Sequence, residues 1–329
     1  MLEKLLKDTI SGQPFIRDTF YFYKKNIKHL IVIEGPTASG KTSLSVDLAK
    51  YFNTAIISAD SRQFYKELEI GTAKPSIEEQ NGIQHYFIDS HSVLDEVSSA
   101  RFEREGLQIL NELFKSNDVA ILVGGSGMFI DALCYGLDNI PADPAIKAVI
   151  QKEYDEFGTH PLLDELKQKD PNYYNTIDRE NPMRIIRAIE VIRITGKPYS
   201  ELRKAKPKSR PFQIHKYVIN HDRKILYDRI NLRVDLMIKA GLIDEARSVI
   251  QHRGLASLNT VGYKEIFDYI DGNCTLEDAI ERIKQNTRRY AKRQLTWFRR
   301  HKDAVWIDYD KNSKMIESIL QNFNSTMQA

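Results

Sequence analysis

The chain is poor in cysteine, has no long apolar run and carries little net charge. Its 329 residues include two cysteines, Cys134 and Cys274, which lie far apart and outside any CxxC pair. Two such thiols cannot form a zinc site alone, so we expect small buried residues of a reducing compartment. No apolar stretch approaches the ~18 residues of a membrane span. The first residues mix acids and bases, unlike a secretory signal, and we expect a cytoplasmic protein without membrane contact.

The remaining composition sets only broad limits. Charged residues make up 28% and hydrophobic residues 42%, as in an ordinary globular protein, and a chain of this length can bury one large core with an insert. A net charge of +3 argues neither for nor against nucleic acid, so the distribution of charge must decide.

The most informative segment is GPTASGKT at residues 35–42, between the apolar strand HLIVIE and the amphipathic sequence SLSVDLAKYF. Its glycines let successive N–H groups face phosphate oxygens, and the following helix adds its dipole. Lys41 supplies a point charge, and the Thr42 hydroxyl is predicted to hold Mg²⁺. The predicted phosphate-binding residues are Gly35, Pro36, Thr37, Ala38, Ser39, Gly40, Lys41 and Thr42.

Two further strand ends bear on which phosphate is bound. AIISAD ends in Asp60, and AILVGG leads into a glycine turn with Ser126. In open α/β sheets the ligand crevice lies outside the carboxyl ends of the strands, so both residues are expected near the P-loop. An ATPase would end one such strand in an aspartate that orders magnesium, whereas this strand ends in glycine. Asp89 of QHYFIDS is a substitute, or simply a turn cap.

Alternating strands and helices predict the fold class. We expect a P-loop NTPase-like, doubly wound parallel sheet with strands at 55–58, 84–89 and 119–123 and a helix at 98–116. From about residue 135 the apolar positions have helical spacing, with no good strand until HKYVINHD at 215–222. The expected parts are a helical extension at 1–28, a first core part at 29–134, a helical insert at 135–203, and a second core part with a basic C-terminal helix at 204–329.

The strongest nucleic-acid signal is RIKQNTRRYAKRQLTWFRR at residues 282–300, with eight Lys or Arg residues and no acid. Arg282, Arg289, Arg293 and Arg300 are spaced as one helical stripe. A solvated helix face is the alternative, but the absence of balancing acids favours RNA contact.

A second basic cluster lies on the sequence NPMRIIRAIEVIR of the expected insert. Its members are Arg184, Arg187 and Arg193, and two basic faces on two lobes suggest a clamp. Arg193 could equally pair with Glu190 as a plain surface ion pair.

Six segments in this order resemble the tRNA dimethylallyltransferase family, also called tRNA isopentenylpyrophosphate transferases. They are GPTASGKT, SADSRQFYKELEIGTAKP, LVGGSGMFIDAL, NPMRIIRAIEV, TVGYKE and TRRYAKRQLTWFRR, and the resemblance runs from about residue 31 to 308. It implies transfer of a dimethylallyl group from dimethylallyl diphosphate to N6 of the adenosine 3′ of the anticodon in the tRNA anticodon stem-loop. The P-loop would then hold an allylic diphosphate and not ATP, in a cytoplasmic monomer.

Roles follow from that chemistry. Lys41, the P-loop amides and magnesium at Thr42 would neutralise the departing diphosphate. Asp60 is the candidate acceptor of an N6 proton, with a turn cap as the alternative. Ser126 stands where the family usually has threonine; its hydroxyl would bind the base or the diphosphate, or it is only a small residue in a glycine turn.

For four other side chains the sequence leaves two alternative roles open. Arg229 and Arg233, one turn apart in DRINLRV, are candidates for diphosphate contact or a solvent-facing pair. The target adenosine must leave the loop stack, and Phe64 or Tyr65 could stack on it, unless they belong to the core.

The resemblance also implies a set of RNA contacts. In this set Met183 and Arg184 stand where the family usually has Gln-Arg, and a methionine cannot hydrogen-bond a base. The implied residues are Asp60, Ser61, Arg62, Gln63, Ser126, Lys147, Met183, Arg184, Ile185, Ile186, Arg187, Asn259, Thr260, Val261, Gly262, Tyr263, Lys264, Lys292, Arg293, Gln294, Leu295, Thr296, Trp297, Phe298 and Arg299.

Two other function classes remain open at the level of sequence. One is an adenylate isopentenyltransferase or small-molecule kinase, and the other is an RNA-binding NTPase. The basic C-terminal segment and the insert count against free nucleotides as substrates, which need neither. The glycine ending of AILVGG counts against the NTPase.

Overall fold

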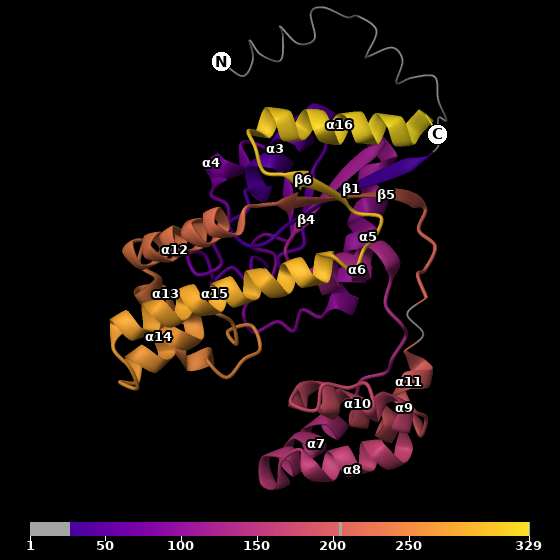
Figure 1. Ribbon diagram of the computed structural model, residues 1–329, viewed down its shortest axis with the longest axis vertical. Helices are drawn as coiled ribbons and strands as arrows, with labels where there is room; N and C mark the ends of the chain where they lie inside the picture. The colour runs from indigo at the N-terminus through magenta and orange to yellow at the C-terminus, as the bar shows by residue number, and fades with distance from the viewer. Residues whose placement is uncertain (1–26, 204–205, 329) are drawn as a thin grey trace, which may run out of the picture. The chain divides into compact units, whose positions relative to one another are not determined.

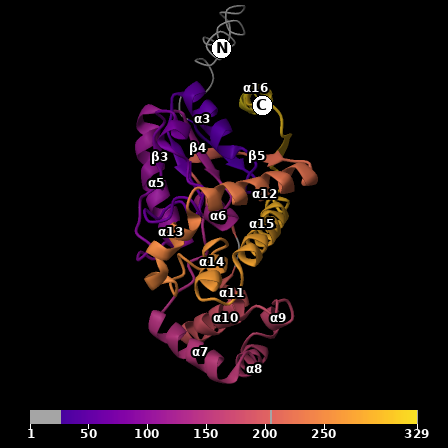
Figure 2. The same ribbon diagram turned by 90° about the vertical axis from the view of Figure 1, so that its left-hand side faces the viewer.

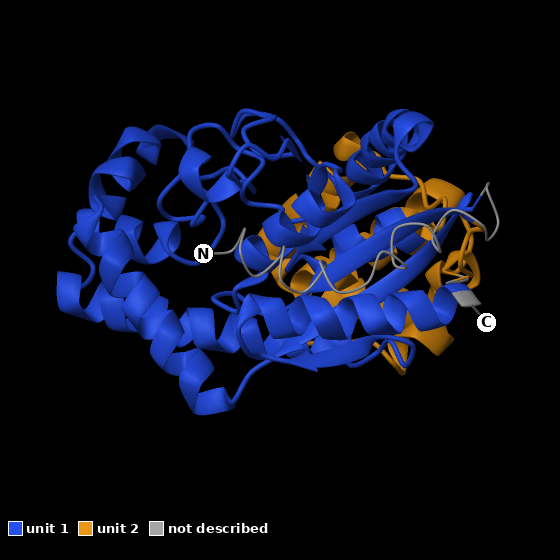
Figure 3. Cartoon of the chain, turned by 90° about the horizontal axis from the view of Figure 1, so that it is seen from above, with its two compact units in different colours: residues 1–134, 210–329 blue, residues 135–209 orange. Residues whose placement is uncertain are grey.

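The computed structural model describes residues 27–203 and 206–328, so the expected extension at 1–28 lies almost wholly outside the described residues. The chain forms two compact units, shown in different colours in Figure 3. Unit 1 comprises Met1–Cys134 and Arg210–Ala329, and unit 2 comprises Tyr135–Ser209. No helix within the described ranges is long and apolar enough to cross a membrane.

Unit 1 is built on a six-stranded parallel sheet with the order β3-β2-β4-β1-β5-β6, which confirms the predicted fold class. The strand that leads into the P-loop is central, with Ile31 beside Ile121 on one neighbour and His215 on the other. The strands are β1 (Lys28–Glu34), β2 (Ile56–Ser58), β3 (His85–Tyr86), β4 (Val119–Gly124), β5 (Phe212–Asn220) and β6 (Val305–Asp308).

The structure corrects the predicted strands at the sheet edges. β3 has two residues and not six, because Phe87 and Asp89 adopt positive φ angles of 64° and 52° and leave the extended conformation. The edge strand β6, with the sequence VWID, was not predicted from its short apolar pattern. β5 begins at Phe212, ahead of the predicted start at 215.

Helices cover both faces of this sheet (Figure 1). α3 and α16 pack on one face, where Leu44, Leu48, Met315, Ile319 and Phe323 join the apolar residues of the strands. The spacing of the last three residues by four positions puts them on one side of a helix. α5 and α6 lie on the opposite face. The bounds are α3 (Lys41–Phe52), α4 (Ile77–Gln80), α5 (Ser99–Ser116), α6 (Gly127–Tyr135) and α16 (Asn312–Gln328).

A second apolar cluster in unit 1 joins the helices that follow β5 (Figure 2). Val234, Leu242, Tyr263 and Ile283 are buried in it, together with Leu68 from the segment after β2. This cluster fixes where the basic segment lies relative to the sheet. The elements are α12 (Arg223–Lys239), α13 (Leu242–Ser248), η1 (Ile250–His252), α14 (Tyr263–Ile270) and α15 (Leu276–Phe298).

The regular elements described in unit 2 are all helices. Asp143 and Asn181 each cap a helix whose first residue is proline, which is the arrangement that local backbone preferences favour. Ile150, Leu166 and Ile189 are buried where these helices meet. The helices are α7 (Pro144–Phe157), α8 (His160–Lys169), α9 (Pro171–Tyr174), α10 (Pro182–Thr195) and α11 (Tyr199–Leu202).

Candidate active site

The P-loop forms the predicted turn between β1 and α3. Gly40 has a φ angle of 85°, which strains any residue with a side chain. A Cβ atom on Gly35 would lie 2.7 Å from Ser39 Oγ, so steric constraints favour glycine at both positions. The loop backbone can therefore approach a bound anion closely, and the first turn of α3 adds N–H groups without a partner in the helix at the same place.

Lys41 closes over this loop. Its ammonium donates to the Pro36 carbonyl at 2.7 Å and lies 3.4 Å from Ser39 Oγ. Burial lowers the pKa of Lys41 to about 8; the carboxylate of Asp60 opposes this shift, and Arg233 adds to it. A bound phosphate would offer a charged acceptor in place of a neutral carbonyl, and it would favour the ammonium form.

Two arginines of α12, Arg229 and Arg233, point at the P-loop. Arg229 Nε donates to the Ala38 carbonyl at 2.7 Å, and an Arg233 nitrogen lies 3.4 Å from Thr37 Oγ1. Neither forms an ion pair with a carboxylate of the described residues, and burial lowers the pKa of Arg233 even though Asp60 opposes the shift. The solvent-facing alternative is therefore wrong, and three cationic side chains converge on the loop.

Thr42 fits the predicted role at a magnesium ion. Its hydroxyl lies in the first turn of α3 and makes no side-chain hydrogen bond within the described parts of the chain. Magnesium in phosphate sites is commonly held by one or two protein oxygens together with the phosphates, so one hydroxyl is a sufficient protein ligand. The described residues contain no cluster of three or more His, Cys, Asp or Glu that could hold a metal without such a ligand.

The predicted turn cap of Asp60 is confirmed, and its role as proton acceptor stays a prediction. One carboxylate oxygen caps the turn by accepting the Arg62 N–H at 3.1 Å. Its charge also acts on Lys41 and Arg233, so it lies near these two cations of the P-loop site. The turn cap occupies one oxygen, which leaves the second oxygen for a ligand.

Ser126 ties the glycine turn after β4 to the turn after β2. Its hydroxyl oxygen accepts the Ser61 N–H at 3.0 Å and lies 3.2 Å from Ser61 Oγ. Tyr290 of α15 lies near the same serine, and burial, with Asp60 in support, raises the pKa of Tyr290 to about 12. Tyr290 was not among the predicted site residues; the signal that relates it to Gln294 is its position four residues earlier on one helical face.

Phe64 and Tyr65 do not stack on an adenosine. Both are buried, with 0% and 5% of their surfaces exposed. The Phe64 ring stacks on Phe102 with centroids 5.7 Å apart and also contacts Phe87. The core alternative holds for these residues, and the base-stacking prediction is wrong.

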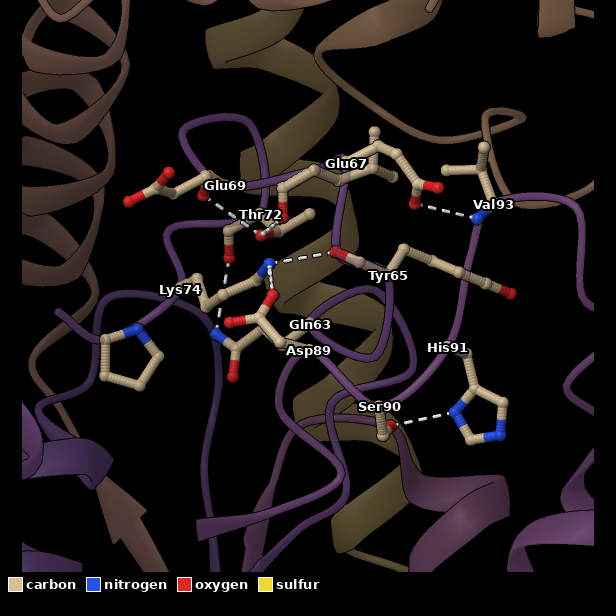
Figure 4. A network of polar contacts seen from close by, with 12 residues as sticks. Gln63, Tyr65, Glu67, Glu69, Thr72, Lys74, Asp89, Ser90, His91 and Val93 are labelled. Atoms are coloured by element: carbon tan, nitrogen blue, oxygen red, sulfur yellow. Dashed lines mark hydrogen bonds and ion pairs between the residues drawn. The ribbon is translucent and has the colours of Figure 1, made fainter. Parts of the chain in front are cut away.

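The segment after β2 is fastened by polar contacts, shown in Figure 4. Lys74 pairs with Asp89 and donates to the Tyr65 carbonyl at 2.8 Å, while the Gln63 amide donates to the carbonyls of Thr72 and Ala73. Asp89 thus forms an ion pair and accepts no backbone N–H of the described residues, so it is not a turn cap, while its role as a substitute magnesium ligand stays a prediction. The side-chain amide nitrogen of Gln63 likewise forms its hydrogen bonds within the protein.

The residues implied for RNA contact on α15 divide between two faces. Lys292, Arg293 and Arg299 are exposed, as is Thr296. Gln294 and Phe298 are 6% and 0% exposed, which excludes side-chain contact with RNA and corrects their assignment. The remaining two, Leu295 and Trp297, are half-buried.

The predicted arginine stripe is only partly continuous. Arg289 and Arg293 are exposed on α15, and Arg293 lies over the Tyr290 ring. Arg282 is 3.8 Å from Asp268, and Arg300 lies beyond the end of the helix. The free charge is therefore concentrated in the second half of α15.

The residues implied for RNA contact at 259–264 also differ in their exposure. Asn259 and Lys264 are exposed, whereas Tyr263 is buried and donates its hydroxyl to Glu245 at 2.6 Å. The same carboxylate accepts three consecutive backbone N–H groups, from residues 69–71. Side-chain contact of Tyr263 with RNA is thus excluded, because it anchors this loop. Gly262 is buried as well, and Thr260 and Val261 are half-buried.

In unit 2 the predicted basic cluster is largely neutralised. Arg193 pairs with Glu153 and Glu165, at 2.8 and 2.6 Å, and not with Glu190. Glu190 instead pairs with Arg187 at 2.7 Å. Among the other implied residues, Ile185 and Ile186 are buried in the helical core, which rules out their side chains as RNA contacts, and Lys147, Met183 and Arg184 are exposed.

The parallel sheet and the loop between β1 and α3 define the class: a P-loop α/β protein. The family is shown by comparison with known proteins. A sequence model of the IPP transferase family matches residues 63–301, and the chain belongs to this family.

Curated relatives and solved structures agree with this. The chain is 47% identical over 295 residues to tRNA dimethylallyltransferase 1 of Bacteroides thetaiotaomicron, covering 89% of this chain and 96% of that protein. It is 49% identical over 280 residues to tRNA dimethylallyltransferase of Cytophaga hutchinsonii, with coverages of 85% and 92%.

The structural neighbours include tRNA isopentenylpyrophosphate transferase from Bacillus halodurans, with a TM-score of 0.66, 38% identity and coverages of 91% and 96%. A eukaryotic dimethylallyltransferase crystallised in its action on tRNA has a TM-score of 0.75 and 27% identity, with coverages of 91% and 80%.

Proposed function

We propose that this protein transfers a dimethylallyl group from dimethylallyl diphosphate to N6 of the adenosine 3′-adjacent to the anticodon of tRNAs. The observation that carries the proposal is the convergence of Lys41, Arg229 and Arg233 on a P-loop that faces Asp60. These cations have neutral partners, so they suit an anionic ligand. The names of the relatives supply the reaction.

The reaction breaks the bond between C1 of the allyl group and the diphosphate oxygen, and it forms a bond between N6 and C1. The electron pair of the broken bond leaves with the diphosphate, whose charge Lys41 and the two arginines neutralise. Magnesium, when bound at Thr42, would supply further neutralisation of the same leaving group. No nucleotide hydrolysis is needed.

Asp60 is the proposed acceptor of the N6 proton. Its free carboxylate oxygen can hold the amine by one N–H, direct the nitrogen lone pair toward C1, and take the proton as the bond forms. Ser126 and the Tyr290 hydroxyl lie on the same side of the crevice and are proposed to bound the adenine pocket.

The tRNA anticodon stem-loop is proposed to bind the exposed cations of α15, together with Lys147 and Arg184 of the helical insert at 135–203. Met183 is exposed at the start of α10 and lacks hydrogen-bonding capacity, so it would contact a base only through apolar surface. We also propose that the enzyme acts as a cytoplasmic monomer.

The direct test is incubation of the protein with labelled dimethylallyl diphosphate, Mg²⁺ and an unmodified anticodon stem-loop. The expected product carries the label on N6 of the nucleotide after the anticodon. Parallel reactions contain AMP as acceptor or ATP alone. Label on AMP would indicate the free-nucleotide enzyme instead, and rapid ATP hydrolysis without transfer would indicate an NTPase.

Asp60→Asn tests the proton acceptor. Asparagine keeps the shape and the oxygen that caps the Arg62 N–H, but it removes the charge. We expect kcat to fall about a hundredfold, with little change in KM for the donor. Normal turnover by this variant would demote Asp60 to a turn cap.

A further inference from the structure

We infer that Gln294 is a positioning residue that holds the donor-binding P-loop and the acceptor-side glycine turn at a fixed separation. Its amide is buried within unit 1, and it bonds the backbone of both segments. The inference rests on the proposed function, which assigns the P-loop to the donor and the turn carrying Ser126 to the acceptor.

Both halves of the Gln294 amide are used. Its carbonyl oxygen accepts the Thr37 N–H at 2.9 Å, and its nitrogen donates to the Gly125 carbonyl, also at 2.9 Å. Only an uncharged amide offers a donor and an acceptor at this separation. A glutamate would bond the Thr37 N–H but would present an acceptor to the Gly125 carbonyl and a negative charge to the diphosphate.

The glycine turn is shaped around this amide. A Cβ atom on Gly125 would lie 2.2 Å from Gln294 Nε2, while the nearest atom outside Gln294, the Gly35 carbonyl oxygen, is at an ordinary 3.6 Å. A side chain at position 125 would therefore displace the Gln294 amide before it disturbed anything else.

The two bonded segments carry the reacting partners. Thr37 is a P-loop residue whose hydroxyl lies 3.4 Å from Arg233. Gly125 precedes Ser126, which binds the Ser61 N–H in the turn after Asp60. One amide thus links a loop that faces the leaving group to a loop that faces the nucleophile. A shift of about 1 Å between such groups can cost a hundredfold in rate.

The helix that carries Gln294 is itself fixed against α6. Trp297 Nε1 donates to Asp131 at 2.9 Å, and His301 lies 2.9 Å from the same carboxylate. The Trp297 ring also occupies the space above Gly127, where a Cβ atom would lie 2.2 Å away. These contacts set the distance from α15 to the crevice independently of the amide, so removal of the amide should leave the helix in place.

The test uses a double-mutant cycle in the full-length protein. Gln294→Ala removes both hydrogen bonds, and Gly125→Ala displaces the amide without altering Gln294. We expect each single variant to lower kcat tenfold to a hundredfold and to raise KM for dimethylallyl diphosphate severalfold, with KM for tRNA unchanged. The double variant should be no worse than Gln294→Ala, because the two changes break the same link.

Asn117→Leu is the matched control. It also removes an amide that donates to a backbone carbonyl, that of Asn53, but it lies before β4, at the amino ends of the strands. It should leave all kinetic constants unchanged. Binding of inorganic diphosphate is measured by calorimetry for each variant, so the P-loop is examined without turnover, and a melting curve checks folding.

Wild-type kinetics in both single variants, or additive losses in the double variant, would overturn the inference. A drop in melting temperature with unchanged kcat and diphosphate affinity would also overturn it, since the role would then be structural only. A wild-type enzyme that forms no product on tRNA refutes the proposed function instead, and diphosphate affinity then still decides whether Gln294 positions the P-loop.

Discussion

Two pairs of arginines on two helices look alike in the sequence but have opposite surroundings. Arg187 and Arg193 of α10 are paired with glutamates of unit 2. Arg229 and Arg233 of α12 bond two carbonyls and two hydroxyls of unit 1, two of these four groups in the P-loop. Neither arginine has a carboxylate within ion-pair distance among the described residues.

This difference separates structural charge from charge available to a ligand. The carboxylates around Arg193 raise its pKa and fix its position in the helical core. Arg233 shows the opposite shift, because burial lowers its pKa without a paired carboxylate. A buried cation is costly without an anionic partner, which supports the proposal that an anionic ligand binds the site on α12.

The largest expected effect comes from removing one charge of each pair. Arg233→Gln should lower kcat/KM for dimethylallyl diphosphate about a hundredfold, because the enzyme loses a positive charge that neutralises the leaving diphosphate. Arg193→Gln should leave that constant nearly unchanged and lower the melting temperature by about 4 °C. Steady-state kinetics and thermal melts of both variants provide the measurement. If Arg193→Gln lost activity at unchanged stability, the two pairs would not differ as described.

An intermediate effect is expected from pH. The pKa of Lys41 is lowered to about 8, and a bound diphosphate favours its charged form. Donor affinity should thus be constant below pH 8 and fall by up to about tenfold per pH unit above it. The reason is that Lys41 loses its proton at a lower pH in the free enzyme than in the complex with diphosphate. Titrations between about pH 7 and 9.5 measure this.

Lys41→Arg serves as the control for that titration. Arginine keeps its charge over the whole range, so the pH dependence should flatten even if affinity is lower overall. A wild-type affinity that is constant to about pH 9.5 would show that Lys41 does not contact the diphosphate.

The smallest effect is expected on the exposed face of α15. Neutralising Arg289 and Arg293 together to Gln should reduce the slope of log affinity for tRNA against log salt by about one to two. Lys50→Gln with Lys314→Gln removes the same charge from helices on a sheet face away from the crevice and should leave the slope unchanged. Equal slopes in all three proteins would mean that the α15 face is only solvated.

Local sequence was sufficient where one segment determines its own geometry. The P-loop, its two constrained glycines and the following helix were predicted because strand, turn and helix signals are contiguous. The prediction failed at β3 and β6, because short edge strands have few residues to show a pattern. At Phe64 the sequence left two alternatives open, since an aromatic residue beside a site can equally belong to the core, and the structure decides for the core.

The sequence by itself determined the phosphate-binding loop, the parallel α/β sheet and the accumulation of positive charge on α15, because each depends on residues that are near neighbours in the chain. Tertiary structure alone decided which cations stay free for a ligand and which side chains join the site. Arg229 meets Ala38 across 191 positions, and Gln294 meets Thr37 across 257. Such pairings depend on how helices pack, and helical periodicity gives the face of a residue without naming its partner.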